Sequence, residues 1–208
     1  MALKAVLFDM DDTLIDWSQF GMDWPRFEQP FLQRVYRFVE ERTSTQGDFS
    51  AFEAHFRDRT RYAWENGRAT HIAPNLGHIL GETARTLTGQ DFVIDELLTA
   101  YEWSAPPGVS TFPDVPPFLD KLQSNGITTG IITNAFQPMW LRDIELAHYD
   151  LLQYFPAYRY SAADIGYLKP HPTIFQTVLA QLGIGADEAV FVGDNPTADI
   201  IGAQRVGM

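Results

Sequence analysis

Hydrophobic positions in the chain follow two patterns, and the first is a set of short, continuous apolar runs. These runs lie at residues 3–8, 127–132 and 189–192, and each of them ends in polar residues. A strand buried on both faces of a parallel sheet has this pattern, because helices cover both of its sides. We therefore expect these runs to be strands, with a shorter strand at residues 157–160.

The second pattern is the helical spacing of apolar residues between the expected strands. It covers residues 116–125, 172–182 and 196–206, each of which begins with Pro and stops at or near a Gly. Proline is favoured in the first turn of a helix and glycine just past its end. A further helix is expected after the sequence TNAF. Strands and helices that alternate in this way predict a doubly wound α/β core with a parallel sheet.

Residues 17–105 interrupt this alternation. They contain no run with the strand pattern, and their apolar residues recur at helical spacing. We expect helices at about 24–42, 48–66, 75–88 and 91–103, separated at Gly47, Gly67, Pro74 and Gly89. The turn-rich segment 106–108 is expected to be the boundary at which the chain leaves the insertion and re-enters the core. The sequence thus predicts an all-helical domain, residues 17–105, inserted into a core domain formed by residues 1–16 and 106–208.

Composition and charge narrow the possible partners. The formal net charge of −12 argues against nucleic acid as a partner, since that binding depends on clustered Lys and Arg. No apolar run approaches the roughly eighteen residues of a membrane span, and the N-terminus lacks a signal-peptide pattern, so we expect a cytoplasmic protein without membrane contact. The absence of cysteine excludes disulfides, thiolate ligands and a cysteine nucleophile. The sequence does not indicate an oligomeric state.

Candidate site residues follow the expected strands. In an open α/β sheet, ligands bind outside the carboxyl ends of the strands. The polar residues near these ends are Asp9, Asp11, Thr133, Asn134 and Asp194, and Lys169 precedes a helix. Carboxylates that are clustered and taken out of water need a cation or a donor. Oxygen ligands of this kind suit Mg²⁺, which would also bind a substrate phosphate.

Two other interpretations of these residues were weighed. Asp12, Thr133 and Asp194 could each cap a turn or helix, and for any one of them alone capping is the better explanation. Capping does not require several acids, a Thr and a Lys at one sheet edge, so their convergence favours a functional site. An EF-hand calcium loop is excluded, because Leu14 stands where that loop needs Gly and Phe20 stands where it needs Glu.

Four segments together resemble the haloacid dehalogenase-like hydrolase superfamily, in its branch with a helical cap. They are VLFDMDDTLI, GIITN, GYLKPHPTIF and AVFVGDNPTADIIGA, and they occur in the order of that family's motifs. The resemblance covers the whole chain. It implies a Rossmann-like, doubly wound parallel sheet core with an inserted all-helical cap domain.

The resemblance also implies roles for the acids. Asp9 would be the nucleophile that forms an aspartyl-phosphate, and Asp11 would be the general acid and base. Mg²⁺ would be held by the carboxylates of Asp9 and Asp194 and by the backbone carbonyl of Asp11.

Further residues are implied to hold the transferring phosphoryl group. These are Thr133, the backbone beside Asn134, and Lys169. Asp199 is implied to orient Lys169 or a metal-bound water.

Asp11 separates two activities within the family. The dehalogenases lack an aspartate at this position and use no metal, whereas the phosphatases have one. The resemblance therefore implies a Mg²⁺-dependent phosphatase for a small phosphorylated metabolite of the sugar phosphate, nucleotide or phosphoglycolate type. The alternatives are a 2-haloacid dehalogenase and a non-enzymatic phosphoacceptor or binding protein. Substrate selection is expected from cap residues such as Arg57, Arg61, Arg68 or His71, or otherwise from loop 16–21.

Overall fold

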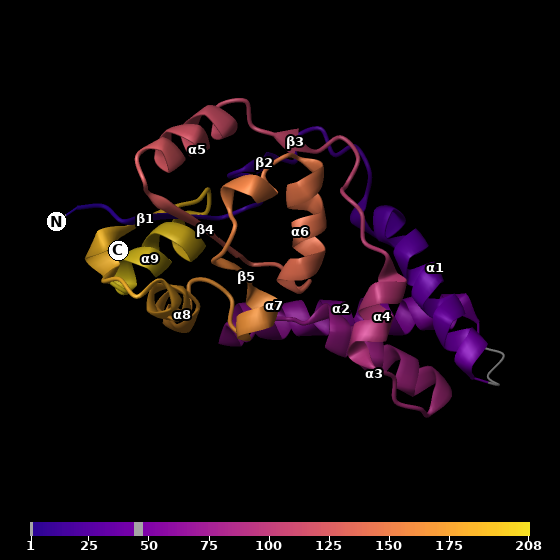
Figure 1. Ribbon diagram of the computed structural model, residues 1–208. Coiled ribbons are helices and arrows are strands. Elements are labelled where there is room, and N and C mark those ends of the chain that lie inside the picture. The colour runs from indigo at the N-terminus through magenta and orange to yellow at the C-terminus, as the bar shows by residue number, and fades with distance from the viewer. Residues whose placement is uncertain (1, 44–47) are drawn as a thin grey trace.

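The computed structural model describes residues 2–43 and 48–208 and contains a four-stranded parallel sheet at its centre (Figure 1). The strand order is β5-β4-β1-β6, formed by Arg159–Ser161, Thr128–Thr133, Ala5–Phe8 and Ala189–Val192. Strand β1 pairs with both β4 and β6, so its carboxyl end lies between theirs. The expected α/β core is confirmed, although β5 begins two residues later than predicted.

Helices cover both faces of the sheet because alternate residues of β1 point to opposite sides. Val6 and Phe8 pack in one apolar cluster with residues of α5 (Val115–Ser124) and α6 (Met139–His148). Leu7 packs in another cluster with residues of α8 (Pro172–Leu182) and α9 (Gly202–Arg205). The short helices α7 (Ala162–Ile165), η1 (Leu152–Tyr154) and η2 (Ala186–Glu188) lie in the connections. This is the doubly wound arrangement that the sequence predicts.

The helical insertion lies between two short strands, β2 (Ile15–Asp16) and β3 (Ser110–Thr111), which pair in antiparallel fashion. Its helices are α1 (Trp24–Arg42), α2 (Phe49–Thr70), α3 (Leu76–Thr88) and α4 (Ile94–Tyr101). They lie beside the sheet domain in Figure 1 and bury an aromatic-rich cluster of their own. The all-helical cap is therefore confirmed. The pairing of β2 with β3, which joins the two connections to the cap, was not predicted.

Several predicted helix ends were wrong. Helix α2 does not stop at Gly67 but continues to Thr70, and His71 ends it in the left-handed conformation with φ 61°. Gly67 is there for close packing, since a Cβ atom would lie 2.9 Å from the Ile72 carbonyl oxygen and 3.0 Å from Leu168 Cδ1. Helix α4 is shorter than the expected 91–103. The break expected at Gly47 lies outside the described residues.

The predicted helix 196–206 is divided in two. Residues Pro196–Ile201 form a π-helical turn, η3, and the α-helix α9 follows. The Asn195 side chain accepts hydrogen bonds from the backbone N–H groups of Thr197 and Ala198, which fixes the first turn. Within residues 2–43 and 48–208, no helix combines the length and the apolar character needed to cross a bilayer.

Candidate active site

Three acids converge at the carboxyl ends of β1 and β6. Asp9 directly follows β1, and its backbone N–H donates to the Val192 carbonyl at the end of β6, 2.8 Å away. Asp194 and Asp199 come from the segment after β6. One carboxylate oxygen from each of these three residues lies within 4.8 Å of the other two. Parallel pairing thus places residues nearly 190 positions apart in the sequence into one acidic cluster.

Lys169 supplies the cation that the structure shows in this cluster. Its Nζ lies 2.8 Å from Asp9 Oδ1 and 2.7 Å from Asp199 Oδ1, and the residue is 3% exposed. The Asn134 side chain holds the backbone of Lys169 by accepting from its N–H at 2.7 Å and donating to its carbonyl at 3.1 Å. Asn134 therefore positions Lys169 through its side chain. This role is separate from the one expected from the sequence, in which the backbone beside Asn134 contacts the phosphoryl group.

Burial changes the acidity of Asp9. Desolvation raises the pKa of Asp9 to about 6, and the neighbouring Lys169 ammonium opposes this rise. One ammonium thus faces three carboxylates, and the net negative charge favours a bound cation. The donors are hard carboxylate oxygens that converge within reach of one ion, so the residues fit Mg²⁺.

Asp199 reaches this cluster because Gly193 leaves room for it. A Cβ atom at position 193 would collide with the Asp199 carboxylate. Asp199 is fully buried, and its Oδ2 accepts a hydrogen bond from the backbone N–H of Asn195 at 2.9 Å. The turn after β6 therefore holds Asp199 against Lys169, while Asp194 remains exposed at the rim.

Thr133 and Asp11 lie on the other side of Asp9. Thr133 ends β4, is 1% exposed, and its Oγ1 lies 3.5 Å from Asp11 Oδ2. The Asp11 carboxylate does not belong to the group of three clustered acids. Instead, Asp11 Oδ1 accepts from Trp17 Nε1 at 2.9 Å and from Arg142 Nη2 at 2.6 Å.

Trp17 and Arg142, which hold Asp11, were not predicted from the sequence. Arg142, on α6, is 3% exposed and also contacts Glu145 Oε1 through Nη1 at 3.0 Å. Glu145 is fully buried and accepts from Trp103 Nε1 at 2.7 Å. Burial would lower the pKa of Arg142, but the Asp11 and Glu145 carboxylates raise it, whereas burial raises the pKa of Glu145 to about 7.

A sequence signal for this network exists on α6. Arg142 and Glu145 fall on the same helical face as the apolar residues Met139 and Leu146, because they lie three or four positions apart. Charged residues on an apolar face are rarely buried unless they are paired. This pattern could have predicted a buried ion pair but not its contact with Asp11.

Three adjoining cavities surround the site. The acids, Thr133 and Lys169 line a cavity of about 180 Å³. A second cavity, about 340 Å³, shares Asp11 and Asn134 with it, and a third, about 280 Å³, shares Asn134 and Lys169. The lining of the second includes four aromatic residues, Trp17, Trp24, Trp64 and Phe136, and the third includes Arg68 and His71 from the cap.

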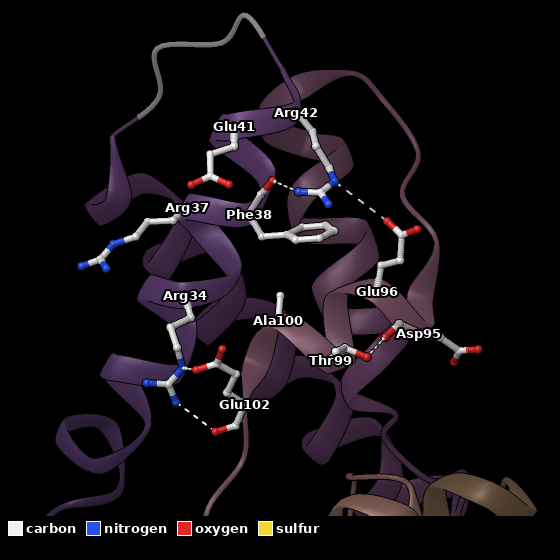
Figure 2. A pocket seen from close by; sticks show the side chains of 10 residues that line it. All are labelled: Arg34, Arg37, Phe38, Glu41, Arg42, Asp95, Glu96, Thr99, Ala100 and Glu102. Carbon is white, nitrogen blue, oxygen red and sulfur yellow. Dashed lines mark hydrogen bonds and ion pairs between the residues drawn. The ribbon is translucent and has the colours of Figure 1, made fainter.

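A larger cavity lies away from the acids, between α1 and α4 on the cap (Figure 2). Its volume is about 710 Å³, and four of its charged residues form two pairs. Arg34 contacts Glu102 at 2.9 Å, and Arg42 approaches Glu96 at 4.0 Å. Its size alone does not make it the candidate site, because none of the clustered acids lines it.

Comparisons with known proteins agree with this geometry. The family model described as haloacid dehalogenase-like hydrolase matches residues 3–207. The chain is 30% identical to the glyceraldehyde 3-phosphate phosphatase of Methanopyrus kandleri, over 99% of this chain and 82% of that protein. It is 28% identical to the phosphoglycolate phosphatase of Yersinia pseudotuberculosis, over 99% and 78% respectively.

Solved structures with similar folds include both activities of the family. A HAD phosphatase from Thermococcus onnurineus has a TM-score of 0.58 and 28% identity, over 99% of this chain and 84% of that one. A 2-haloacid dehalogenase from Pseudomonas syringae has a TM-score of 0.59 and 27% identity, with the same coverage. The fold alone therefore does not distinguish the two reactions.

Proposed function

The chain belongs to the haloacid dehalogenase-like hydrolase family, and we propose that it is a Mg²⁺-dependent phosphatase for a small phosphate monoester. The observation that carries this proposal is the arrangement of Asp9. Its buried carboxylate lies beside Lys169, and a second aspartate two residues later, Asp11, lines the adjoining cavity. A nucleophile, a cation for the phosphoryl oxygens and a separate acid are the groups that this hydrolysis needs.

In the first step, an Asp9 carboxylate oxygen attacks phosphorus and the bond from phosphorus to the ester oxygen breaks. Asp11 donates its proton to that oxygen, so the leaving group departs as a neutral alcohol. In the second step, Asp11 takes a proton from water, and the water oxygen attacks the phosphorus of the aspartyl-phosphate. The bond to Asp9 breaks, inorganic phosphate is released, and both aspartates return to their starting states.

Lys169, the Thr133 hydroxyl and the backbone N–H groups beside Asn134 would bind the phosphoryl oxygens. Mg²⁺ would be held by the carboxylates of Asp9 and Asp194 with the Asp11 carbonyl, and it would offset the charge of the phosphoryl oxygens. Asp199 keeps the Lys169 ammonium directed toward Asp9, which the two contacts below 3 Å support.

We further propose that residues 17–105 act as a cap on a core formed by residues 1–16 and 106–208. Cap residues Trp24, Thr60 and Trp64 line the cavity that shares Asp11 with the acidic site. A bound ester would thus lie between the two parts, where water is excluded during phosphoryl transfer.

The names of the relatives support a small substrate. Glyceraldehyde 3-phosphate, phosphoglycolate and phosphoserine, for which relatives are named, are compact phosphate monoesters. We extend to this chain only the general class of compact phosphate monoesters, without the carboxylate that phosphoglycolate and phosphoserine carry. A 2-haloacid dehalogenase is the alternative, and the Asp11 carboxylate argues against it, because this acid has a role in the phosphatase reaction and none in displacement of a halide.

The proposal is tested by parallel assays of the purified protein. Phosphate release from a panel of monoesters, with Mg²⁺ and then with EDTA, is compared with halide release from 2-chloropropionate. We expect Mg²⁺-dependent phosphate release and no halide release. Halide release without phosphate release, or phosphate release that persists after complete removal of metal, would overturn the corresponding part of the proposal.

A further inference from the structure

The cavity next to Asp11, here called the aromatic cavity, has walls of unusual composition. Trp17 and Trp24 form one ring pair, with centroids 6.1 Å apart, and Trp64 and Phe136 form another at 6.2 Å. Its volume of about 340 Å³ is at the lower end for small-molecule sites. Large aromatic walls favour a flat or apolar ligand, which gains both apolar burial and ring stacking.

The position of Asp11 identifies which part of a substrate would enter this cavity. In the proposed reaction, Asp11 gives its proton to the ester oxygen, so the leaving group must lie against Asp11. The aromatic cavity is lined by Asp11, whereas the neighbouring cavity that contains Arg68 and His71 is not. The leaving group is therefore directed toward the four aromatic side chains.

The charges in the aromatic cavity are already paired. Arg142 is the cation in its lining, and its guanidinium contacts the carboxylates of Asp11 and Glu145 at 2.6 and 3.0 Å. A carboxylate on the leaving group would have to compete with two acids for this cation while it gave up its own hydration. The cavity therefore disfavours a charged leaving group.

Two neutral polar groups in the cavity lack partners. The Gln137 side chain is 3% exposed and makes no hydrogen bond within residues 2–43 and 48–208. The hydroxyl of Thr60 is buried and also has no partner in that part of the chain. Buried hydroxyls are normally paired, because an unpaired one is unfavourable. Both groups are thus available to a ligand with a neutral hydrogen-bonding atom.

We propose that the leaving group of the natural substrate is a neutral aromatic or heteroaromatic alcohol whose ring carries a hydrogen-bonding atom. This inference rests on the proposed phosphatase function and deepens it. The ring would lie among Trp17, Trp24, Trp64 and Phe136, and its polar atom would pair with Gln137 or Thr60. The esters of small hydroxy acids, which have a free carboxylate, are then poor substrates.

The inference is tested with esters that differ mainly in the leaving group. Methyl, benzyl, 4-pyridylmethyl and carboxymethyl phosphates are assayed with Mg²⁺, since methanol and benzyl alcohol have similar basicity and kcat/KM then reports on binding. We expect benzyl phosphate to exceed methyl phosphate about tenfold, and 4-pyridylmethyl phosphate to exceed both. If carboxymethyl phosphate is the best substrate, or the ring gives no advantage, the inference is wrong although the phosphatase proposal stands. If none of the four is hydrolysed, the phosphatase proposal fails and the inference fails with it.

Two substitutions separate the ring contact from the polar contact. Trp64→Leu should lower the benzyl-to-methyl ratio of kcat/KM about tenfold, and Gln137→Leu should lower the pyridylmethyl-to-benzyl ratio. Trp140→Leu is the matched control, because Trp140 is 45% exposed on α6 and does not line the cavity. Ratios are used because a general loss of folding lowers both substrates equally. Unchanged ratios in both variants, or an equal change in the control, would overturn the inference.

Discussion

At the scale of single residues, the Asp9 carboxylate determines the electrostatics of the site. It lies beside one ammonium and two further acids, and burial raises its pKa from the usual 3.8 to about 6. A carboxyl group whose pKa is raised by folding binds protons more tightly in the folded state. In the metal-free protein, Asp9 therefore contributes stability at low pH that is lost as the pH rises from about 4 to about 6.

The first prediction follows for Asp9→Asn. The amide resembles the protonated carboxyl group, so in EDTA at pH 7 to 8 this variant should be more stable than the native protein. Its unfolding free energy should be higher by at most about 3 kcal/mol, and it should melt at a higher temperature. The advantage should shrink below pH 6 and vanish near pH 4. Thermal or urea unfolding across this pH range measures it. If the native protein is more stable than Asp9→Asn at pH 7 in EDTA, the ionised Asp9 carboxylate does not destabilise the folded protein, and the prediction is wrong.

The second prediction concerns the buried pair of Arg142 and Glu145. Arg142→Met leaves the fully buried Glu145 carboxylate without its cation and should destabilise the protein by about 3–5 kcal/mol. The double variant Arg142→Met/Glu145→Gln should recover part of this loss, because the amide is neutral and can still accept from Trp103. Urea unfolding of both variants and of Glu145→Gln completes the double-mutant cycle. Losses that simply add would show that the two side chains are not coupled.

The site residues at strand ends could be predicted from the sequence, but the contacts of Asp11 could not. Asp9, Thr133 and Asp194 follow apolar runs, so a parallel sheet brings them to one edge whatever the details of packing. The contacts of Asp11 with Trp17 and Arg142 depend on where the cap connection and α6 lie in space. No local pattern encodes that placement.

At the scale of elements, the segment that ends α2 is hydrogen-bonded to the core segment 166–168, next to Lys169. The backbone N–H of Leu168 donates to the His71 carbonyl at 2.8 Å, and that of Ala73 donates to Gly166 at 3.0 Å. Ile72 and Tyr167 form an antiparallel bridge at the same place. A movement of the cap as a lid would have to break these bonds, in addition to bending the paired strands β2 and β3.

The third prediction tests this contact through Gly67. A Cβ atom there would come too close to the Ile72 carbonyl oxygen and to the Leu168 side chain, so Gly67→Ala should destabilise the protein by about 1–3 kcal/mol. Gly81→Ala on α3 is the control, because its Cβ would meet only the end of the Ile94 side chain, which can move. Thermal unfolding of the two variants is compared. Equal melting temperatures would show that α2 can shift from the core without cost.

The fourth prediction separates the cap cations that the sequence could not distinguish. Arg57 contacts Glu28 and Glu53, and Arg61 pairs with Asp58 on an exposed face, whereas Arg68 and His71 line the cavity that also contains Lys169. We therefore expect Arg68→Ala and His71→Ala to change the order of kcat/KM values among substrates with a charged leaving group, which the aromatic cavity disfavours. Arg61→Ala is the matched control and should preserve that order. A changed order in the control alone would place selectivity elsewhere on the cap.

Helices were predicted correctly where the spacing of apolar residues agrees with a Pro at the start and a Gly just past the end. Helix α8 has the predicted bounds because Pro172 begins it and Gly183, in the left-handed conformation, ends it. Gly67 misled the prediction, because its role is contact with the core and not helix termination. The sequence did not indicate the π-helical turn η3, in which the Asp199 side chain accepts from the Asn195 N–H and contacts Lys169.

At the scale of the whole molecule, the helical cap lies beside the parallel-sheet core (Figure 1), and cap residues line the two cavities that adjoin the acidic site. The core supplies Asp9, Thr133, Lys169 and Asp194, which would act on the phosphoryl group common to all substrates. Residues 17–105 supply Trp17, Trp24, Thr60 and Trp64 to the aromatic cavity, which would contact the part that differs between substrates. The central claim is that these parts cooperate in phosphoryl transfer through Asp9.

That claim is tested most directly by trapping the covalent intermediate. The protein is mixed with a hydrolysable phosphate monoester and Mg²⁺, quenched with acid during turnover, digested and analysed by mass spectrometry. We expect a phosphoryl group on Asp9, absent when EDTA replaces Mg²⁺ and absent in the Asp9→Asn variant, which should also lack turnover. Continued hydrolysis by Asp9→Asn at a rate near that of the native protein, with no phosphorylated Asp9 at any quench time, would show that Asp9 is not the nucleophile.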